Sequence, residues 1–422
     1  MLEDGTVIVA GAGQAGAWAA ASMRTAGFAG RIVLVGDEPH RPYERPPLSK
    51  ELLRGEDPDP SIHPADAFDA QNLELRIGHR VEAISLDEHT VTLTGPDTAE
   101  PEVLAYDRLI LTTGGRPRPA PFPGGGLPGV LTLRTIEDAR VLAQQLRTGA
   151  PVAVVGGGWI GLEVAAAARG HGCPTTVLEF ASRLCPRTVP PVISAYLLRL
   201  HESHGVDVRL GAQVSAIVPS CSTVTGCAAG PADGHPGLVV QCADGTEIPA
   251  ATVVVGVGLI PNDEVAAEAG IVCDNGIVVD AACRTSDPAV FAAGDVTVSP
   301  NPYSGVPVRL ESWQNAQEQG AAAGRSALGI DTEHAILPWF WSDQYQATVQ
   351  IYGLPQEHHV MTLRGDPEGE DFTVLYTEGD RLKAAMGPGN AREIKLCRRI
   401  IDRQIPIDVS ALADPSVALP RR

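Results

Sequence analysis

Gly11-Ala12-Gly13-Gln14-Ala15-Gly16 follows the short apolar run Thr6–Ala10 and directly precedes an alanine-rich run that is expected to form a helix. A second version, Gly156-Gly157-Gly158-Trp159-Ile160-Gly161, follows Val152–Val155 and also opens a helical run. In a dinucleotide-binding turn the first glycine allows a tight turn, the second lets the backbone approach a pyrophosphate, and the third lets helix and strand pack closely. The N-terminus of the helix offers free N–H groups to the phosphates. The sequence therefore predicts two dinucleotide-binding units.

An acid follows each glycine turn at the distance that ribose binding requires. Ile32–Val35 precedes Asp37 and Glu38, and Thr175–Leu178 precedes Glu179. One Gly-x-Gly-x-x-Gly pattern alone is weak, because a glycine-rich strand-to-helix turn occurs in any α/β protein. Two copies, each with a strand, a helix and an acid, are specific, and they predict two dinucleotides, of which the usual pair is FAD and a nicotinamide.

The composition sets limits on the class of protein. A chain of 422 residues suggests two or three domains, and 44% hydrophobic residues are enough for real cores. A net charge of −19 argues against a general affinity for nucleic acid. No apolar run is long enough for a membrane span and no signal segment precedes the first strand, so we expect a cytoplasmic protein.

Cysteine and lysine usage is informative. The eight cysteines all lie beyond residue 172, and none forms a Cys-x-x-Cys pair. We therefore expect free thiols and no metal site. The chain has three lysines, at positions 50, 383 and 395, which makes Lys50 conspicuous. Lys50 ends a proline-rich stretch after the first acid, in which Leu48-Ser49-Lys50 is expected to start a short helix. That stretch could lie along a bound cofactor or be a surface proline loop.

The remaining segments predict further strands and helices. In the first half, strands are expected at 73–77, 81–86, 90–93 and 108–112, and a helix at 135–147. Helices are expected at 191–204 and 312–328, and strands at 206–210, 214–218 and 253–258, with a surface hairpin insertion at 219–235. A strand closing on Gly294-Asp295 places a carboxylate where it can accept a ribityl hydroxyl, although another strand-to-helix turn would give the same pattern.

The last stretch predicts a different kind of domain. It opens with Pro338-Trp339-Phe340-Trp341-Ser342-Asp343-Gln344 and continues with strands near 347–352, 358–364, 373–377 and 381–386 and a helix at 391–403. This pattern is α+β rather than alternating. In the final helix an apolar stripe is formed by Ile394, Cys397, Ile400 and Ile401. The basic residues lie mostly off it, either as a solvated face or as a docking patch for an acidic partner: Arg392, Lys395, Arg398, Arg399 and Arg403.

Taken in order, these motifs resemble one family over essentially the whole chain. The strings that carry the resemblance are the two glycine turns, Arg41-Pro42-Tyr43-Glu44-Arg45-Pro46-Pro47-Leu48-Ser49-Lys50, Thr112-Thr113-Gly114-Gly115-Arg116-Pro117, Ala293-Gly294-Asp295 and Pro338–Gln344. The chain is similar to the FAD-dependent NADH:ferredoxin reductases of bacterial oxygenase systems, the putidaredoxin reductase and biphenyl dioxygenase ferredoxin reductase family. The fold expected is α/β, with two Rossmann-like domains, as in glutathione reductase, and a C-terminal α+β domain. The expected domains are 1–116 with 248–326 for FAD, 117–247 for NAD, and 327–422 as an interface domain.

The resemblance also implies the site residues. In the first unit FAD would contact Gly11, Gly13, Ala15, Gly16 and Asp37. Elsewhere it would contact Lys50, Val81, Arg116, Arg134, Asp295 and Val308. NADH would contact Gly156, Gly158, Ile160, Gly161 and Glu179. Lys50 would lie beside the flavin ring, paired with Glu163, and Trp341 would lie near the ring, either shortening the electron route or covering the ring as a lid.

The expected reaction is hydride transfer from NADH to FAD, followed by single-electron transfer to a [2Fe–2S] ferredoxin that serves a cytochrome P-450 monooxygenase or a Rieske dioxygenase. The cation of Lys50 would stabilise the reduced, anionic flavin. Glu179 favours NADH over NADPH, because a carboxylate at that strand end accepts ribose hydroxyls and repels a 2′-phosphate. The ferredoxin would bind transiently and the enzyme is expected to be a monomer.

Other functions are possible on the same fold. A flavin disulfide reductase or a peroxide-reducing NADH oxidase needs a redox cysteine beside the flavin, and the region of Glu44–Lys50 has none. A redox-sensing protein like apoptosis-inducing factor is disfavoured by the absence of a targeting segment and by the acidic charge. A rubredoxin or nitrite reductase as acceptor would change only the partner.

Overall fold

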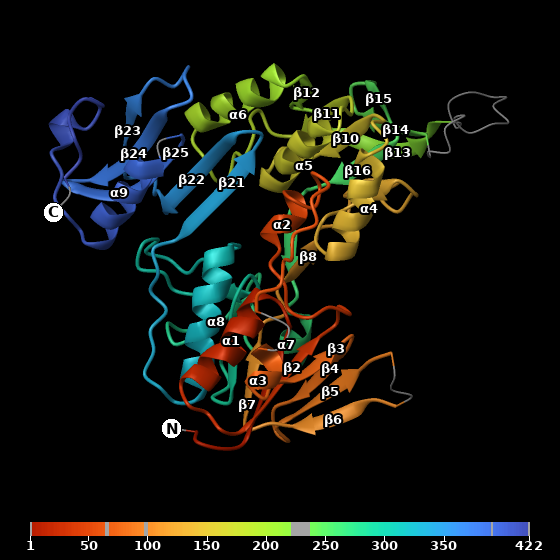
Figure 1. Cartoon of the computed structure of the whole chain (residues 1–422), viewed down its shortest axis with the longest axis vertical. Helices are drawn as coiled ribbons and strands as arrows, with labels where there is room; N and C mark the ends of the chain where they lie inside the picture. Colours follow the sequence, from red (N-terminus) through yellow and green to blue (C-terminus); the bar gives the residue numbers. More distant parts are fainter. Residues whose placement is uncertain (1, 64–66, 97–99, 221–236, 390, 421–422) are drawn as a thin grey trace.

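The computed structural model describes residues 2–63, 67–96, 100–220, 237–389 and 391–420. Three parts, each built on one five-stranded sheet, make up the molecule. The first lies at the bottom of Figure 1, the second at the upper right and the third at the upper left. Within the described ranges, no helix combines the length and the apolar character needed to cross a bilayer.

The first part is a parallel sheet in the order β19-β7-β1-β2-β3. Its strands are β1 (Thr6–Ala10), β2 (Arg31–Gly36), β3 (Glu74–Ile77), β7 (Arg108–Leu111) and β19 (Val290–Ala292). Helices α1 (Gln14–Thr25) and α8 (Trp313–Ala327) cover one face side by side. They approach closely at Gly320, where a Cβ atom would lie 2.3 Å from the carbonyl oxygen of Ala15. The apolar strands of this parallel sheet require cover on both faces, and the two helices bury one of them.

The other face of this sheet packs on a small antiparallel sheet, β4-β5-β6. Its strands are β4 (Arg80–Ser85), β5 (Thr90–Thr94) and β6 (Glu102–Ala105), and β6 is a strand that the sequence analysis missed. Short elements complete the part: α3 (Ala67–Ala70), α7 (Glu264–Glu268), β18 (Ile277–Val278) and β20 (Thr297–Val298). Two short strands pair antiparallel in the two connections to the second part: β8 (Gly115–Pro117) and β17 (Leu259–Pro261).

The second part repeats this plan. A parallel sheet in the order β12-β11-β10-β16-β9 is joined by the antiparallel sheet β13-β14-β15. The parallel strands are β9 (Val130–Leu131), β10 (Val152–Val155), β11 (Thr175–Glu179), β12 (Val206–Leu210) and β16 (Thr252–Val255). The helices are α4 (Ile136–Leu146), α5 (Trp159–Gly170) and α6 (Pro191–Ser203). The antiparallel strands are β13 (Val214–Pro219), β14 (Leu238–Cys242) and β15 (Glu247–Ala250).

The hairpin insertion expected at 219–235 lies almost entirely outside the described residues, which omit 221–236. The strands on either side of it, β13 and β14, pair antiparallel from Pro219 and Leu238 onward.

The third part is an antiparallel sheet in the order β21-β22-β25-β24-β23. Its strands are β21 (Trp339–Gln344), β22 (Ala347–Gly353), β23 (Val360–Gly365), β24 (Phe372–Glu378) and β25 (Arg381–Pro388). Helix α9 (Ala391–Asp402) packs on β25 and β22, and a short 3₁₀ turn follows at Val409–Ala411. The apolar stripe predicted for α9 is confirmed, since Ile394, Cys397, Ile400 and Ile401 are all buried. The edge strand β21, formed by Trp339–Gln344, was not predicted from the sequence.

The proline-rich segment that follows Asp37 and Glu38 differs from the sequence prediction in one detail. The short helix α2 spans Pro46–Ser49 and ends before Lys50, whereas the expected helix began at Leu48. A proline at the first helical position explains the earlier start, since its fixed φ suits a helix N-terminus.

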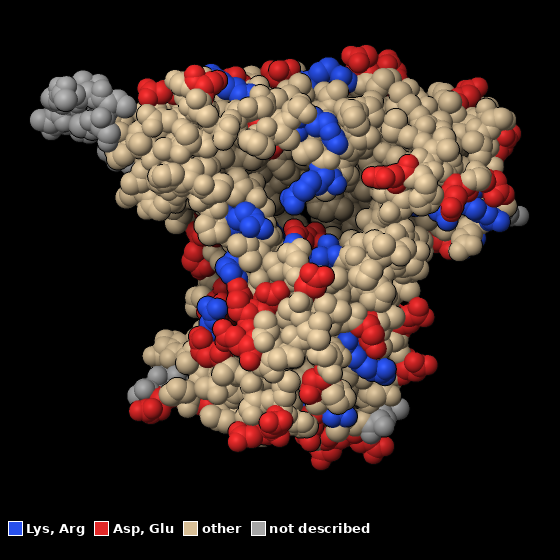
Figure 2. Space-filling view, turned by 180° about the vertical axis from the view of Figure 1, so that it is seen from behind, with Lys and Arg blue, Asp and Glu red and all other residues tan. Residues whose placement is uncertain are grey.

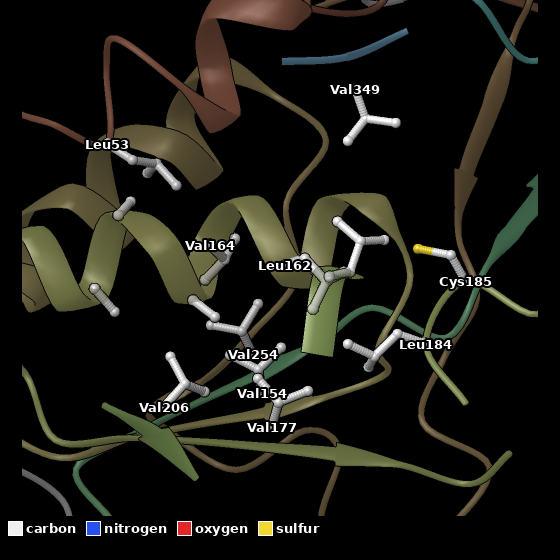
Figure 3. Packing of buried hydrophobic residues seen from close by; sticks show 14 of the residues in the cluster. Leu53, Val154, Leu162, Val164, Val177, Leu184, Cys185, Val206, Val254 and Val349 are labelled. Atoms are coloured by element: carbon white, nitrogen blue, oxygen red, sulfur yellow. The ribbon is translucent and has the colours of Figure 1, made fainter. Parts of the chain in front are cut away.

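One apolar core joins the second part, the third part and the α2 segment. It contains Leu48, Leu52 and Leu53 from the α2 segment, the core of the second part, and residues of the third sheet such as Val349 and Phe372. Figure 3 shows Leu53 and Val349 both above α5, the helix that carries Leu162 and Val164, and toward its opposite ends. The α2 segment therefore crosses from the first part and packs into the core of the second.

Candidate functional site

The first glycine turn lies between β1 and α1. Gly11 has φ +122°, and a Cβ atom there would lie 2.2 Å from the carbonyl oxygen of Thr112. A Cβ atom at Gly16 would lie 1.9 Å from the carbonyl oxygen of Gly11, so only glycine lets the helix pack against the turn. The middle residue, Gly13, faces open space within 4 Å and is the N-cap of α1. The turn is thus closed at both ends and open where a pyrophosphate would approach.

The second glycine turn has the same geometry between β10 and α5. Gly156 has φ +113°, and a Cβ atom there would lie 2.3 Å from the carbonyl oxygen of Gly256. A Cβ atom at Gly161 would lie 2.1 Å from the carbonyl oxygen of Gly156, while Gly158 faces open space. Neither Gly13 nor Gly158 has a side chain that could cap the helix, so both helices leave their first N–H groups for an anion.

The acids after the two turns differ in their surroundings. Glu179 Oε2 accepts a hydrogen bond from Gly157 N at 2.6 Å, and Oε1 accepts one from Ala181 N at 2.7 Å. In the described part of the chain, Asp37 is exposed and has no hydrogen bond or ion pair. The neighbouring Glu38 is instead bound to Tyr43 Oη and to Arg45 Nη2. Asp37 is therefore free to accept the hydroxyls of a ligand, and Glu179 is held in place against the second turn.

The nearest arginine downstream of Glu179 is not available to a ligand. Arg183 donates to the carbonyl oxygens of Val189 and Pro186 and to Ser194 Oγ. Because these three hydrogen bonds hold both Nη atoms against the loop and the first turn of α6, the guanidinium is not turned toward a 2′-phosphate at Glu179.

A buried ion pair joins the first segment to the second part. Lys50 Nζ lies 2.8 Å from Glu163 Oε1, and the two residues are 8% and 4% exposed. Ser49 Oγ donates to Glu163 Oε2, and Ser342 Oγ donates to Glu163 Oε1 at 2.6 Å. Lys50 follows α2, Glu163 lies on α5 and Ser342 on β21, so this cluster needs all three parts of the molecule. A buried charge pair with these additional hydrogen bonds satisfies the conditions under which such pairs are retained.

Three tryptophans lie next to this cluster. The ring of Trp341 stacks on Trp339 at 4.8 Å and meets Trp313, at the start of α8, edge-on at 6.0 Å. Lys50 Nζ lies 5.8 Å from the centre of the Trp341 ring. The ring of Trp341 therefore lies near the ammonium group of Lys50, at the junction of the first and third parts.

Charged side chains gather at the carboxyl end of the first sheet. Arg134 Nη2 lies 3.2 Å from Asp295 Oδ2, and Arg309 donates to the carbonyl oxygen of Asp295 at 3.4 Å. Gly294, next to Asp295, lies beside Ala15 of α1, because a Cβ atom at Gly294 would be 3.0 Å from that of Ala15. Asp295 and Arg134 are thus brought to the first glycine turn.

The burial and bonding of these arginines fit an anionic ligand. Burial lowers the pKa of Arg134, and the positive charge of nearby Arg45 lowers it further. Among the described residues, the Nε atoms of both Arg134 and Arg309 are buried without a partner. Two unsatisfied guanidinium N–H groups beside an open glycine turn are the donors that a pyrophosphate would use. The residues present therefore fit FAD at the first unit.

Other predicted contacts lie further from this cluster. Arg116 is exposed on β8, where its guanidinium bonds to Asn262 and Glu264. Val81 on β4 packs against the core between the two sheets of the first part. Val308 pairs with Ser299 through backbone hydrogen bonds. Ile160, beside the second turn, is partly exposed. The proposed cofactor contacts of these residues remain predictions.

Several residues of the site escaped the sequence analysis. Ser49, Ser342, Arg45 and Arg309 carry contacts described above, although none was singled out as a site residue. Ser49 and Ser342 stand inside strings that carried the family resemblance, and this was the available signal. Arg309 had no such signal, since its role depends on the approach of distant segments.

The cysteines are not arranged for redox chemistry. All six that the structure describes are free thiols. Cys185 is buried below the second glycine turn, and burial raises the pKa of its thiol to about 12. A thiol with so high a pKa is not a thiolate nucleophile at neutral pH.

Comparisons with known proteins agree with this geometry. Residues 5–320 match the family described as pyridine nucleotide-disulphide oxidoreductase, and residues 339–421 match the reductase C-terminal family. The ferredoxin–NAD(+) reductase component of the anthranilate 1,2-dioxygenase system of Burkholderia cepacia is 43% identical over 424 residues, with 99% of each chain covered.

A further relative is similar over nearly the whole chain, both in sequence and in its solved structure. Putidaredoxin reductase of Pseudomonas putida is 38% identical, covering 99% of this chain and 97% of its own. The crystal structure of the covalent putidaredoxin reductase–putidaredoxin complex superposes with a TM-score of 0.89 at 38% identity, covering 98% of this chain and 96% of that chain. The fold class expected from the sequence is confirmed.

Proposed function

The chain belongs to the pyridine nucleotide-disulphide oxidoreductase family, and within it we propose that this protein is an NADH-dependent ferredoxin reductase. It carries FAD, takes electrons from NADH and passes them to a [2Fe–2S] ferredoxin that serves an oxygenase. The relatives named above are reductase components of such systems. We keep a cytoplasmic location as part of this proposal, because NADH is an intracellular reductant.

The observation that carries the proposal is the cluster of Lys50, Glu163 and Trp341. It occupies the place where a disulfide reductase would need a cysteine, and the sequence has no cysteine before residue 173. A buried cation held by a carboxylate, with an aromatic ring beside it, suits a site that stabilises negative charge on a cofactor. The site is thus built for electron transfer and not for thiol chemistry.

FAD, when bound, accepts two electrons as a hydride and releases them one at a time. The first glycine turn and the N-terminus of α1 bind its pyrophosphate, with Asp37 at the ribose and Asp295 at the ribityl chain. The unpaired Nε donors of Arg134 and Arg309 neutralise the phosphates. Lys50 supplies positive charge beside the flavin ring, and Glu163 orients it.

The second unit binds NADH. Its pyrophosphate lies on the turn of Gly156, Gly158 and Gly161, and Glu179 accepts the ribose hydroxyls. Each oxygen of a carboxylate can accept more than one hydrogen bond, so Glu179 can bind a ribose while it remains bonded to Gly157 and Ala181. A 2′-phosphate would meet this negative charge without a free Arg183 to balance it, and NADPH is therefore a poor substrate.

The ferredoxin docks where basic side chains surround the site. Figure 2 shows Lys and Arg side chains gathered around a hollow at the middle of one face, between the upper and lower parts of the molecule. The basic residues of α9, with Arg403 directly after it, offer another patch, and all of them are exposed: Arg392, Lys395, Arg398, Arg399 and Arg403. Because the chain as a whole carries −19, docking of an acidic partner depends on a local positive patch. A rate of electron transfer that does not change with ionic strength would refute such a patch.

Steady-state turnover tests the proposal. NADH oxidation is measured with a [2Fe–2S] ferredoxin as acceptor, and then with NADPH as donor or with a disulfide or peroxide as acceptor. We expect turnover with NADH and ferredoxin, slow turnover with NADPH and none with the thiol-type acceptors. Turnover with a disulfide or a peroxide and none with any ferredoxin would contradict the assignment.

A further inference from the structure

A buried line of hydrogen bonds continues from Glu163 in the direction away from Lys50. Ser342 Oγ, which donates to Glu163, accepts from Gln344 Nε2 at 3.2 Å. Gln344 Oε1 lies 2.8 Å from His201 Nε2 on α6. Ser342 and His201 are 0% exposed, and Gln344 is 1% exposed. The third part thus connects the ion pair to a histidine of the second part.

The direction of each hydrogen bond follows from the groups that take part. Gln344 presents its carbonyl oxygen to His201, so His201 Nε2 carries the proton and donates. His201 Nδ1 is then the acceptor, and it faces the hydroxyl of Tyr345 at 3.2 Å. Burial lowers the pKa of His201 to about 4, which agrees with the neutral ring that this pattern requires. Every bond of the line therefore points the same way, toward the carboxylate of Glu163.

The orientation of the Gln344 amide decides where the hydroxyl proton of Ser342 goes. With its amide nitrogen on Ser342, Gln344 leaves that hydroxyl to donate to Glu163. A flipped amide would offer its oxygen to Ser342, and the hydroxyl could then donate to Gln344 in place of Glu163. The flip would require His201 to move its proton to Nδ1 and donate to the Tyr345 hydroxyl, and it would take the Ser342 donor away from Glu163. Without His201, the Gln344 oxygen would have no partner in its present orientation, which would cost a buried hydrogen bond and favour the flip.

Tyr345 stands at the far end of the line. Tyr345 has φ +55°, a left-handed conformation that side chains with a Cβ atom rarely adopt. Its ring stacks on His204 with a centroid distance of 3.7 Å. Tyr345 is the first residue of the two-residue turn between Gln344 of β21 and Ala347 of β22, where such a φ is usual, and this turn directs its hydroxyl to His201.

The line is suited to orientation and not to proton transport. A proton wire needs groups that accept a proton on the atom from which they donate one. Gln344 accepts at oxygen and donates from nitrogen, so a proton cannot pass through it without rearranging the amide.

We propose that His201 is a positioning residue for the Lys50–Glu163 pair: it fixes the Gln344 amide, keeps Ser342 donating to Glu163, and so holds the ammonium of Lys50 at the flavin site. This inference rests on the proposed function for its consequence in catalysis. The positioning itself is a property of the chain and can be tested whether or not a ferredoxin is the acceptor.

The test measures how well Lys50 is held. Because the chain has three lysines, acetylation by a small reagent can be followed at each of them by peptide mass spectrometry. The full-length protein is used as purified, with its flavin, and the rate at Lys50 is divided by the rate at the more exposed Lys383. We expect His201→Leu and Gln344→Leu each to raise this ratio about tenfold, which corresponds to the loss of one buried hydrogen bond.

Three matched variants separate positioning from general loosening. His201→Gln can still donate to Gln344 from its amide nitrogen, and we expect the wild-type ratio to return. Tyr345→Phe removes only the terminal hydroxyl and should have a smaller effect. His334→Leu removes another buried histidine, which lies outside the line and has Asn315 as its partner, and should leave the ratio within twofold of wild type.

The rate of flavin reduction by NADH gives the second readout. It should fall in His201→Leu and recover in His201→Gln, in parallel with Lys50 reactivity. The proposal is overturned if both leucine variants keep the wild-type acetylation ratio, or if His334→Leu raises it as much as they do. A protein that shows the predicted acetylation pattern but no turnover with ferredoxin would contradict the proposed acceptor and leave the positioning role intact.

Discussion

The two dinucleotide units share one glycine geometry and differ at the residue opposite it. Ala10 pairs with Val35 in the first sheet and Val155 with Leu178 in the second, so Gly36 and Glu179 occupy equivalent positions. A Cβ atom at Gly36 would lie 2.5 Å from the Cβ atom of Ala12, which leaves no room for a side chain. In the second unit Gly157 replaces that alanine, and the carboxylate of Glu179 bonds to its N–H.

This difference shows how one motif serves two ligands. In the first unit the acid moves one residue further, to Asp37, which stays exposed and unbonded within the described chain. In the second unit the acid is a structural member of the turn before any ligand binds. On the proposed function, Asp37 is therefore an adaptable ribose contact, and Glu179 is a rigid one that selects against a 2′-phosphate.

Substitution of the third glycine of each turn tests most directly whether the two dinucleotide units use the same glycine geometry. Gly16→Ala and Gly161→Ala both place a Cβ atom about 2 Å from a carbonyl oxygen, so helix and turn must separate. We expect Gly16→Ala to be purified without flavin, and Gly161→Ala to keep its flavin but lose about 100-fold in kcat/KM for NADH. Absorbance spectra and kinetics measure the two effects. Gly170→Ala, at the end of α5 with no atom within 4 Å, is the control and should behave as wild type.

The ion pair that joins the units should be the next largest effect. Glu163→Gln leaves the ammonium of Lys50 buried without its counter-charge, and we expect a loss of about 3 kcal/mol in the free energy of unfolding. Denaturant unfolding measures it. Glu56→Gln removes an exposed partner of Arg54 and should cost less than about 0.5 kcal/mol. Equal losses in the two variants would show that the Lys50–Glu163 pair is no more than a surface contact.

The second part contains a buried histidine, His201, and a second buried histidine, His334, lies next to the first part. Burial lowers the pKa of His201 on α6 and of His334 next to α8 to about 4. The unfolded chain, with a histidine pKa near 6.5, binds more protons than the folded chain between these values, so stability falls as the pH falls through this window. The loss is about 2 kcal/mol per histidine at pH 5.

His201→Gln and His334→Gln should each flatten this pH dependence by about half. Unfolding free energies measured at pH 7 and pH 5 give the comparison. An unchanged slope in either variant would show that the histidine concerned is already charged in the folded protein.

Substitution of the two acids, Glu179 and Asp37, should have the smallest effects on ligand binding, and the two effects should differ in size. Glu179→Gln places an amide N–H against a backbone N–H, so KM for NADH should rise about tenfold and the preference over NADPH should narrow. Asp37→Asn changes a side chain that holds nothing in the protein, and FAD affinity should fall only a few-fold. Steady-state kinetics and flavin release by dilution measure the two. A larger loss for Asp37→Asn would reverse our account of which acid is rigid.

Much of the fold could be predicted because the signals are local. Period, glycine spacing and apolar runs predicted both dinucleotide-binding units, the α+β character of the third part and the apolar stripe of α9. Among the strands that were not predicted, β6 and β21 escaped for local reasons as well. β6 is short, and the tryptophan-rich β21 lacks an alternating pattern, so neither had a strand signature.

The contacts that join the parts could not be predicted from spacing. His201 and Gln344 are 143 residues apart, and neither has a motif around it that indicates a partner. The pairing of Lys50 with Glu163 was expected only through family resemblance, which supplies long-range contacts that periodicity cannot. Likewise, the displacement of the first acid from Gly36 to Asp37 depends on strand register, which the sequence pattern does not fix.

The central claim is that electrons pass from NADH through the flavin to a ferredoxin. An anaerobic stopped-flow experiment tests it directly, mixing the yellow protein first with NADH and then with an oxidised [2Fe–2S] ferredoxin. We predict rapid bleaching of the flavin absorbance by NADH, much slower bleaching by NADPH, and recovery of the absorbance as the ferredoxin is reduced. A protein that binds no flavin, or one that NADH bleaches but no ferredoxin reoxidises, would contradict the account.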